Sequence, residues 1–266
     1  IGRFGMRGNA VYGEIDSGID NVSGDRLFLS GAFQYDITDS IRFNLDVEHI
    51  EKDVTEPTVL RGPTSAANLL TVLPRLPDPA NNAGSEGFMN RAEEDNVLGR
   101  VSWKINSAWD LVVEGGTSYA ERDRRFSTLD NFNPATGLGT LSMSAADGQL
   151  YRNRNGRIEL AGTFATGPVI HELLVGASKN IRRQYSPSTV ARVGTNSAAT
   201  RSNCVLLGLT TTCQQSIYAP VDLADIRFDG TTAYNATRDT SIEDTGYYAF
   251  DRLHFGGPDR DRFSVL

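Results

Sequence analysis

Arginines and aromatic residues lie close together between positions 121 and 154. A guanidinium group offers charge and forked hydrogen-bond donors, and an aromatic ring offers a face for stacking and cation–π contact. Such a set suits an anionic, ring-bearing ligand. The alternative is that the arginines pair with neighbouring acidic residues or with phosphate groups outside the protein. The candidate binding residues are Arg124, Arg125, Phe126, Phe132, Tyr151 and Arg152, with Arg122 and Arg154 beside them.

The two cysteines, Cys204 and Cys213, are separated by the eight residues Val-Leu-Leu-Gly-Leu-Thr-Thr-Thr. In an exported protein, two cysteines so placed indicate a disulfide that closes a small loop. By the chain-entropy estimate such a loop contributes about 2–3 kcal/mol to stability. The alternative is a pair of free thiols.

Other chemistry is poorly supported. The three histidines lie in separate segments without metal-ligand spacing, and the chain has no Gly-x-Ser-x-Gly, phosphate-binding glycine loop or Cys-x-x-Cys. We therefore predict no metal site and no enzyme. A net charge of −7, from 26 Lys+Arg and 33 Asp+Glu, argues against a nucleic-acid partner. No apolar run approaches the roughly 18 residues of a transmembrane helix.

Alternation of apolar and polar residues is the main signal for the elements that hold these side chains. Apolar residues recur at every second position over 27–37, and again over 41–47 after a polar turn at Thr38-Asp39-Ser40. Each strand therefore has one apolar and one polar face. About eight strands plus a terminal stub are expected; the other alternating segments are 4–12, 97–105, 111–119, 158–164, 173–175 and 247–255.

Short turns alternate with long connections, expected at about 15–25, 54–93, 121–149 and 182–241. Outer-membrane barrels have this asymmetry, with short periplasmic turns and long extracellular loops. Aromatic residues near the short turns would form an interfacial girdle; the alternative is the aromatic core of a soluble sheet. The girdle candidates are Tyr35, Phe43, Trp103, Trp109, Phe164 and Phe255.

The expected fold is thus an all-β, antiparallel transmembrane β-barrel. Eight strands can close alone. However, the first strand lacks an earlier partner, the last is cut short, and one loop has about 60 residues. We therefore expect a fragment of a larger, 22-stranded plugged barrel.

Four stretches resemble the TonB-dependent outer-membrane siderophore receptors, and together they cover nearly the whole chain. They are Arg26-Leu27-Phe28-Leu29 with 41–49, 98–103 with Trp109-Asp110-Leu111, 162–176, and 244–251. The resemblance implies that residues 1–266 are part of the receptor's barrel domain, without its plug domain or C-terminal strands. It also implies a Gram-negative outer-membrane location.

The function that the resemblance implies is uptake of a ferric siderophore, energised by the TonB–ExbB–ExbD complex through the missing plug. No intrinsic cofactor is expected, because the siderophore already coordinates its iron. Outer-membrane lipid and lipopolysaccharide would be further partners. Haem, cobalamin or a carbohydrate stay open as substrates. The alternative functions are a passive porin-like channel and a small structural or adhesin barrel.

Overall fold

The computed structural model describes residues 3–62, 75–195, 204–207, 210–220, 226–255 and 263–265. Within these ranges twelve strands form one sheet. No helix among them is long and apolar enough to cross a membrane. The strands are β1 (Phe4–Asp16), β2 (Ser23–Asp36), β3 (Ile41–Thr55), β4 (Val59–Leu60), β5 (Met89–Lys104), β6 (Trp109–Asp130), β7 (Leu138–Thr166), β8 (Val169–Thr195), β9 (Cys204–Leu207), β10 (Thr210–Ser216), β11 (Ile226–Phe255) and β12 (Phe263–Val265).

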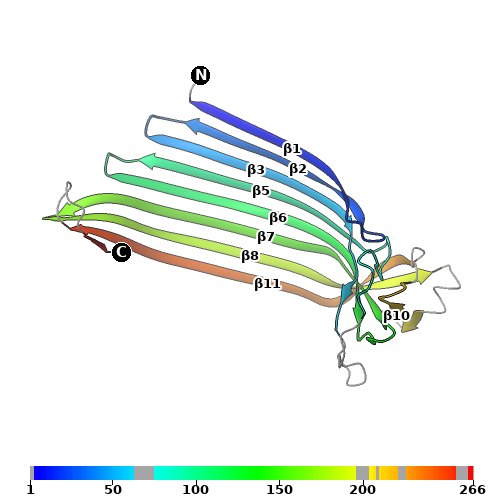
Figure 1. Ribbon diagram of the computed structural model, residues 1–266. Helices are drawn as coiled ribbons and strands as arrows, with labels where there is room; N and C mark the ends of the chain where they lie inside the picture. Colours follow the sequence, from blue (N-terminus) through cyan, green and yellow to red (C-terminus); the bar gives the residue numbers. More distant parts are fainter. Residues whose placement is uncertain are drawn as a thin grey trace.

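Eight long strands and the short β12 lie side by side in the order β1-β2-β3-β5-β6-β7-β8-β11-β12, and each pairs antiparallel with the next (Figure 1). Two short additions lie at one end. There β4 pairs in parallel with β6, and β10 pairs with β7 and β9. The expected antiparallel all-β fold is confirmed.

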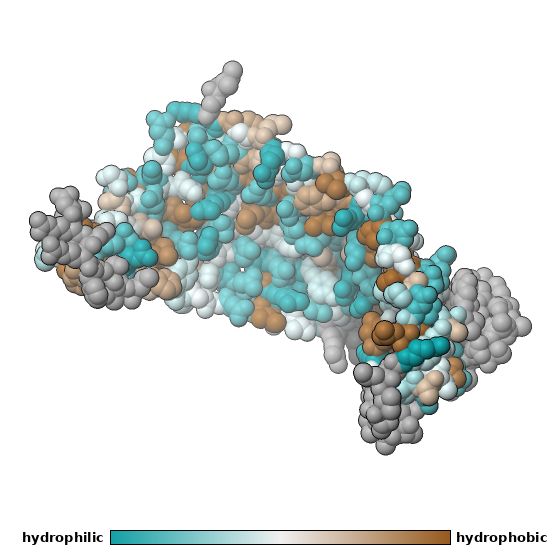
Figure 2. Space-filling model, in the orientation of Figure 1, coloured by the Kyte–Doolittle hydropathy of each residue, from teal (hydrophilic) through white to brown (hydrophobic). Residues whose placement is uncertain are grey.

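The register shows why the sequence alternates. One ladder row runs Tyr35–Phe43–Val101–Val113–Ile158, so apolar residues of five neighbouring strands share one face. We call this the apolar face, and the face that carries the intervening residues the polar face. Figure 2 shows one side of the sheet, where hydrophilic residues predominate over the middle of the strands. Most exposed large hydrophobic side chains, such as Phe33 and Trp103, lie on the apolar face.

Successive hairpins are staggered. Beyond the row through Tyr35 and Ile158, the ladder continues for one residue to Asp36, three residues from Val101 to Lys104, and eight residues from Ile158 to Thr166. Figure 1 shows the resulting staircase of short turns. The extension grows by seven residues over four strand steps, an average shift of just under two residues per strand. Such a shift corresponds to a strand tilt of roughly 45–50°, close to the value of barrel walls.

The strands run further than the sequence predicted. Much of the expected connection 121–149 is strand, because β6 continues to Asp130 and β7 begins at Leu138. The same holds for 182–241, which contains the end of β8 and the start of β11. The prediction of long loops there was wrong in extent. The hydrophobic alternation that would reveal a strand is missing there, because charged residues occupy both faces of 121–125 and the core at the far end of the sheet buries part of 126–149.

The far end from the short turns carries a small core, which we call the cap: residues 56–61, 78–88, 126–149 and 213–220. Every fully buried residue in the described ranges belongs to it. Phe88, Leu129 and Leu141 are completely buried. Beyond Arg124, β4 lies beside β6 in the place that β5 occupies lower down. The buried hydrophobic residues are Ala83, Phe88, Leu129, Phe132, Leu141, Met143, Ala145, Cys213 and Ile217.

Candidate functional site

Arg122 and Tyr151 meet on the polar face, just below the cap. Arg122 Nη2 donates to the Tyr151 hydroxyl at 2.9 Å, and Nε donates to Gln149 Oε1 at 2.9 Å. The guanidinium carbon lies 5.5 Å from the centroid of the Tyr151 ring. Gln149 is only 9% exposed, so the arginine is held by a fixed partner. This places a preoriented cation beside an aromatic ring.

Arg124 lies two residues further along the same face of β6. Its Nε donates to both carboxylate oxygens of Glu56, at 2.8 and 2.9 Å, and its guanidinium carbon is 4.4 Å from the Phe126 ring centroid. Glu56 also accepts a hydrogen bond from Asn90 Nδ2 at 2.6 Å. The structure therefore brings together three sequence candidates, Arg124, Phe126 and Tyr151, with Arg122 beside them.

The two arginines differ in charge balance. Glu56 neutralises Arg124, whereas Arg122 makes its hydrogen bonds to a neutral amide and a phenol and has no ion pair within the described ranges. Arg122 therefore keeps a positive charge with which an anion could pair. The sequence placed Arg122 beside the six candidates but not among them. Its partners, Gln149 and Tyr151, are both uncharged, and that pairing can be seen only once the strand register is known.

The other candidates lie elsewhere. Arg125 follows Arg124 directly on β6, so alternation places its side chain on the opposite face. There Arg125 Nη2 lies 3.7 Å from Asp147 Oδ2. Burial raises the pKa of the Asp147 carboxyl, and Asp123 adds to this, whereas Arg125 opposes it. Phe132 is 9% exposed and belongs to the buried core of the cap. It is not available to a ligand in this arrangement.

Arg152 also points away from Tyr151. It belongs to the apolar-face set of β7, and its guanidinium carbon lies 5.5 Å from the ring centroid of Tyr119 on β6. The sequence grouped Arg152 with Tyr151 because they are adjacent, but adjacent strand residues face opposite ways. The structure thus separates them.

Cys213 is disulfide-bonded and almost fully buried in the cap. The backbone of β9 and β10 sets Cys204 directly opposite Cys213. The chain has no other cysteine. The side chain of Cys204 lies outside the described residues.

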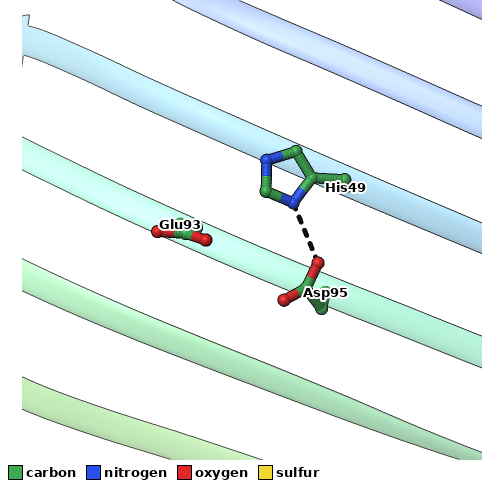
Figure 3. Close-up of side chains that lie close together, drawn as sticks. All are labelled: His49, Glu93 and Asp95. Atoms are coloured by element: carbon green, nitrogen blue, oxygen red, sulfur yellow. Dashed lines mark hydrogen bonds and ion pairs between the residues drawn. The ribbon is translucent and has the colours of Figure 1, made fainter.

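A histidine and two acidic residues gather on neighbouring strands, a grouping that the sequence did not predict (Figure 3). His49 Nδ1 lies 2.8 Å from Asp95 and Nε2 lies 3.0 Å from Glu51. Candidate ligand atoms of His49, Glu93 and Asp95 fall within 4.8 Å of one another. A metal ion would have to displace both ring hydrogen bonds, and Glu93 and Asp95 are exposed. The grouping depends on the pairing of β3 with β5, which a long connection hides from the sequence.

Aromatic rings gather on the apolar face near the short turns. Trp109 and Phe164 stack with centroids 6.1 Å apart, and Phe164 stacks on His171 at 4.6 Å. His171 Nδ1 lies 2.7 Å from Asp251. The Trp109 indole covers Gly162, where an added Cβ would come within 2.2 Å of the ring. The rings of Trp109 and Phe164 are apolar, and the His171–Asp251 contact beside them is polar. Residues at a membrane–water interface combine these two properties.

No family model and no curated protein sequence matches the chain. Solved structures do. The ferric-catecholate import receptor Fiu from Escherichia coli K12, in its open form, matches with a TM-score of 0.73 and 18% identity over 95% of this chain and 38% of that one. The ferric preacinetobactin receptor BauA from Acinetobacter baumannii gives 0.67 and 15% over 96% and 35%.

The ferripyoverdine receptor of the Pseudomonas aeruginosa outer membrane, bound to ferripyoverdine, gives a TM-score of 0.69 and 13% identity over 94% of this chain and 31% of that one. The chain thus has the fold of part of an outer-membrane receptor barrel. It spans about a third of the length of the receptors that it matches.

Proposed function

We propose that this chain is part of the barrel of a TonB-dependent outer-membrane receptor that takes up a ferric siderophore. The observation that carries the proposal is a two-faced, tilted wall, superimposable over almost its full length on receptors for ferric chelates, with a cation and aromatic rings on its polar face. In this proposal the apolar face meets lipid and the polar face lines the lumen.

Arg122 and Tyr151 are the proposed ligand contacts, with Arg124 and Phe126 beside them. They lie on the polar face near the cap, which is the extracellular end of the proposed barrel. An anionic chelate would gain a charge-assisted hydrogen bond from Arg122 and stacking on the rings. Energy coupling would come from TonB, ExbB and ExbD through a plug domain of the complete receptor. Binding and gating, rather than catalysis, are the proposed mechanism.

The test is growth under iron limitation in a strain that lacks the full-length gene. Ferric chelates are supplied one at a time, and the gene is restored as wild type, Arg122→Gln or Arg154→Gln. Arg154 is the matched control because it lies on the opposite face of the neighbouring strand. Loss of a charge-assisted contact is expected to weaken chelate binding about tenfold or more. If no chelate's use depends on the gene, the proposal is wrong.

A further inference from the structure

The ladder between β6 and β7 is interrupted beside the candidate ligand contacts. Arg122 pairs with Gln149, and Arg124 pairs with Ala146, so two steps along β6 correspond to three steps along β7. One residue of β6 therefore lies opposite two residues of β7, which is a β-bulge. The pairing of β7 with β8 is interrupted at the same level. A bulge redirects the side chains of its strand, and bulges are common next to functional sites.

The bulge reverses the alternation of β7. On its short-turn side, the side chains of Gln149 and Tyr151 point to the polar face and accept hydrogen bonds from Arg122. On its other side, Leu141 and Met143 belong to the buried core of the cap. These four residues of β7 all have odd numbers, so an uninterrupted strand would turn them to the same face. The bulge therefore allows one strand to supply the cap core and the partners of Arg122 from opposite faces.

The side chain of Asp123 closes the bulge from β6, opposite Asp147 and Gly148. Gly148 has a φ of 71°, in the left-handed region that glycine adopts without strain. Its backbone N–H is part-buried and donates to Asp123 Oδ1 at 2.6 Å. A carboxylate makes a strong, charge-assisted bond to a backbone N–H, and loss of this acceptor would leave the N–H unsatisfied. Because Gly148 directly precedes Gln149, the bond fixes the backbone from which the Gln149 side chain extends.

Asp123 is not itself placed to contact a ligand on the polar face. It follows Arg122 directly on β6, so alternation points its side chain to the opposite face. Any effect of Asp123 on such a ligand passes through the bulge to the guanidinium group. The charge of Asp123 would act in the opposite sense, because a carboxylate near an anion site repels the anion. Loss of the bulge contact and loss of the charge therefore have effects of opposite sign on anion binding.

We propose that Asp123 is a positioning residue for the ligand contact Arg122, and that it acts by holding the bulge at Gly148. The contacts run from Asp123 to the Gly148 N–H, along the backbone to Gln149, and from Gln149 Oε1 to Arg122 Nε. A held bulge presents the guanidinium group in one orientation, so binding of an anion loses less side-chain entropy. The proposal rests on the proposed uptake function, which supplies the ligand of Arg122.

The first measurement needs no ligand. The full-length receptor in detergent is treated with phenylglyoxal, which modifies arginine side chains, and the rate at Arg122 is followed by mass spectrometry. Asp123→Ala should raise this rate about threefold or more, because the guanidinium group loses its fixed hydrogen-bond partner. Asp123→Asn should stay close to wild type, because its amide oxygen also accepts from Gly148. Glu121→Ala is the matched control, since it removes the same charge from the same face of β6.

The second measurement is equilibrium dialysis with radiolabelled ferric dihydroxybenzoate, an anionic chelate with aromatic rings. Asp123→Ala is expected to bind it about five- to tenfold more weakly, whereas Asp123→Asn and Glu121→Ala should bind within about twofold of wild type. In an Arg122→Gln background, Asp123→Ala should change the affinity less than about twofold, because the two residues act through one contact. Gly148→Ala strains the same bulge through its positive φ and should reproduce Asp123→Ala, which keeps the test valid if that variant does not fold.

Three results would each overturn the positioning role. They are unchanged phenylglyoxal reactivity of Arg122 in Asp123→Ala, an equal loss of affinity in Asp123→Asn or Glu121→Ala, and a full further loss on top of Arg122→Gln. Failure of the uptake proposal gives a different pattern, in which wild type binds no ferric chelate although Asp123→Ala still frees Arg122 toward phenylglyoxal. The two failures are therefore told apart.

Discussion

The wall and the cap differ in where their apolar side chains lie. The wall, which consists of the strands outside the cap, is a single layer without a fully buried residue in the described ranges, and its large apolar side chains face outward. The cap has a small interior in which Phe88, Leu129 and Leu141 are completely buried. In the proposed setting, lipid supplies the apolar environment of the wall, whereas the cap supplies its own in water.

This difference predicts which substitutions should destabilise each region. Truncation of a side chain should damage the cap, because it opens a cavity. Introduction of a charge should damage the wall, because lipid cannot solvate it.

The largest effect is expected for Leu129→Ala. Removal of a fully buried leucine typically costs about 2–5 kcal/mol through lost transfer energy and the cavity left behind. The cost should be confined to the cap, so hydrogen exchange should speed up in 126–149 while β2 and β3 keep wild-type protection. Val113→Ala, on the apolar face of the same strand, is the control and should change exchange little. Faster exchange throughout the wall would show that the two regions form one cooperative unit.

Ile158→Arg is expected to have a comparable but slightly smaller effect, on the wall. Ile158 is on the apolar face and 48% exposed in the structure. An arginine in the lipid-facing band costs up to about 2–4 kcal/mol at the bilayer midplane and less toward its edges. Denaturant titration of the full receptor folded into lipid vesicles would measure it. Asn155→Arg, on the polar face of the same strand, should cost little. Equal costs for the two variants would contradict the assignment of faces.

Gly176→Ala should cost about 1–3 kcal/mol by overpacking. The ring of Tyr248 covers Gly176, and an added Cβ would come within 2.5 Å of it. Gly156→Ala is the matched control, because there the nearest atom is an ordinary 3.9 Å away. The same titration would compare them. Removal of the ring, as in Gly176→Ala/Tyr248→Ala, should abolish the extra cost of the first substitution; a cost that persists would locate the strain elsewhere.

Glu56→Gln should have the smallest effect, at the junction of the two regions. It removes the charge that pairs with Arg124 but keeps an oxygen acceptor, so the cost should be about 1 kcal/mol for this partly exposed pair. Hydrogen exchange should speed up in 56–61, while Glu86→Gln, at an exposed position, should change nothing. Unchanged exchange in 56–61 would mean that the parallel pairing of β4 with β6 suffices to hold this segment in place.

The sequence predicted the wall well and the cap poorly. Alternation over 27–37 and 41–47 revealed both strands, their faces and the turn between them, since each side chain there meets either an apolar or a polar medium. The cap gave no such signal, because its strands are short or irregular and pack on several sides.

The candidate site was predicted in part. Residue types alone suggested Arg124, Phe126 and Tyr151, which the structure places together. The sequence could not show that the Arg152 side chain faces away from Tyr151, because alternation gives no signal where charged residues occupy both faces of a strand. Nor could it show that Glu56 reaches Arg124, since that contact joins positions 68 residues apart.

The two glycines covered by rings also bear on how the strands find their partners. Trp109 lies directly opposite Gly162, and Tyr248 directly opposite Gly176, one pair on each face. A slip of one residue would turn every side chain to the wrong face, but a slip of two would keep the faces correct. Such a slip would bring Tyr248 opposite Ser178 or Leu174 instead, where a Cβ occupies the space of the ring. These pairs therefore disfavour a slip of two residues, which the hydrophobic pattern alone would not penalise.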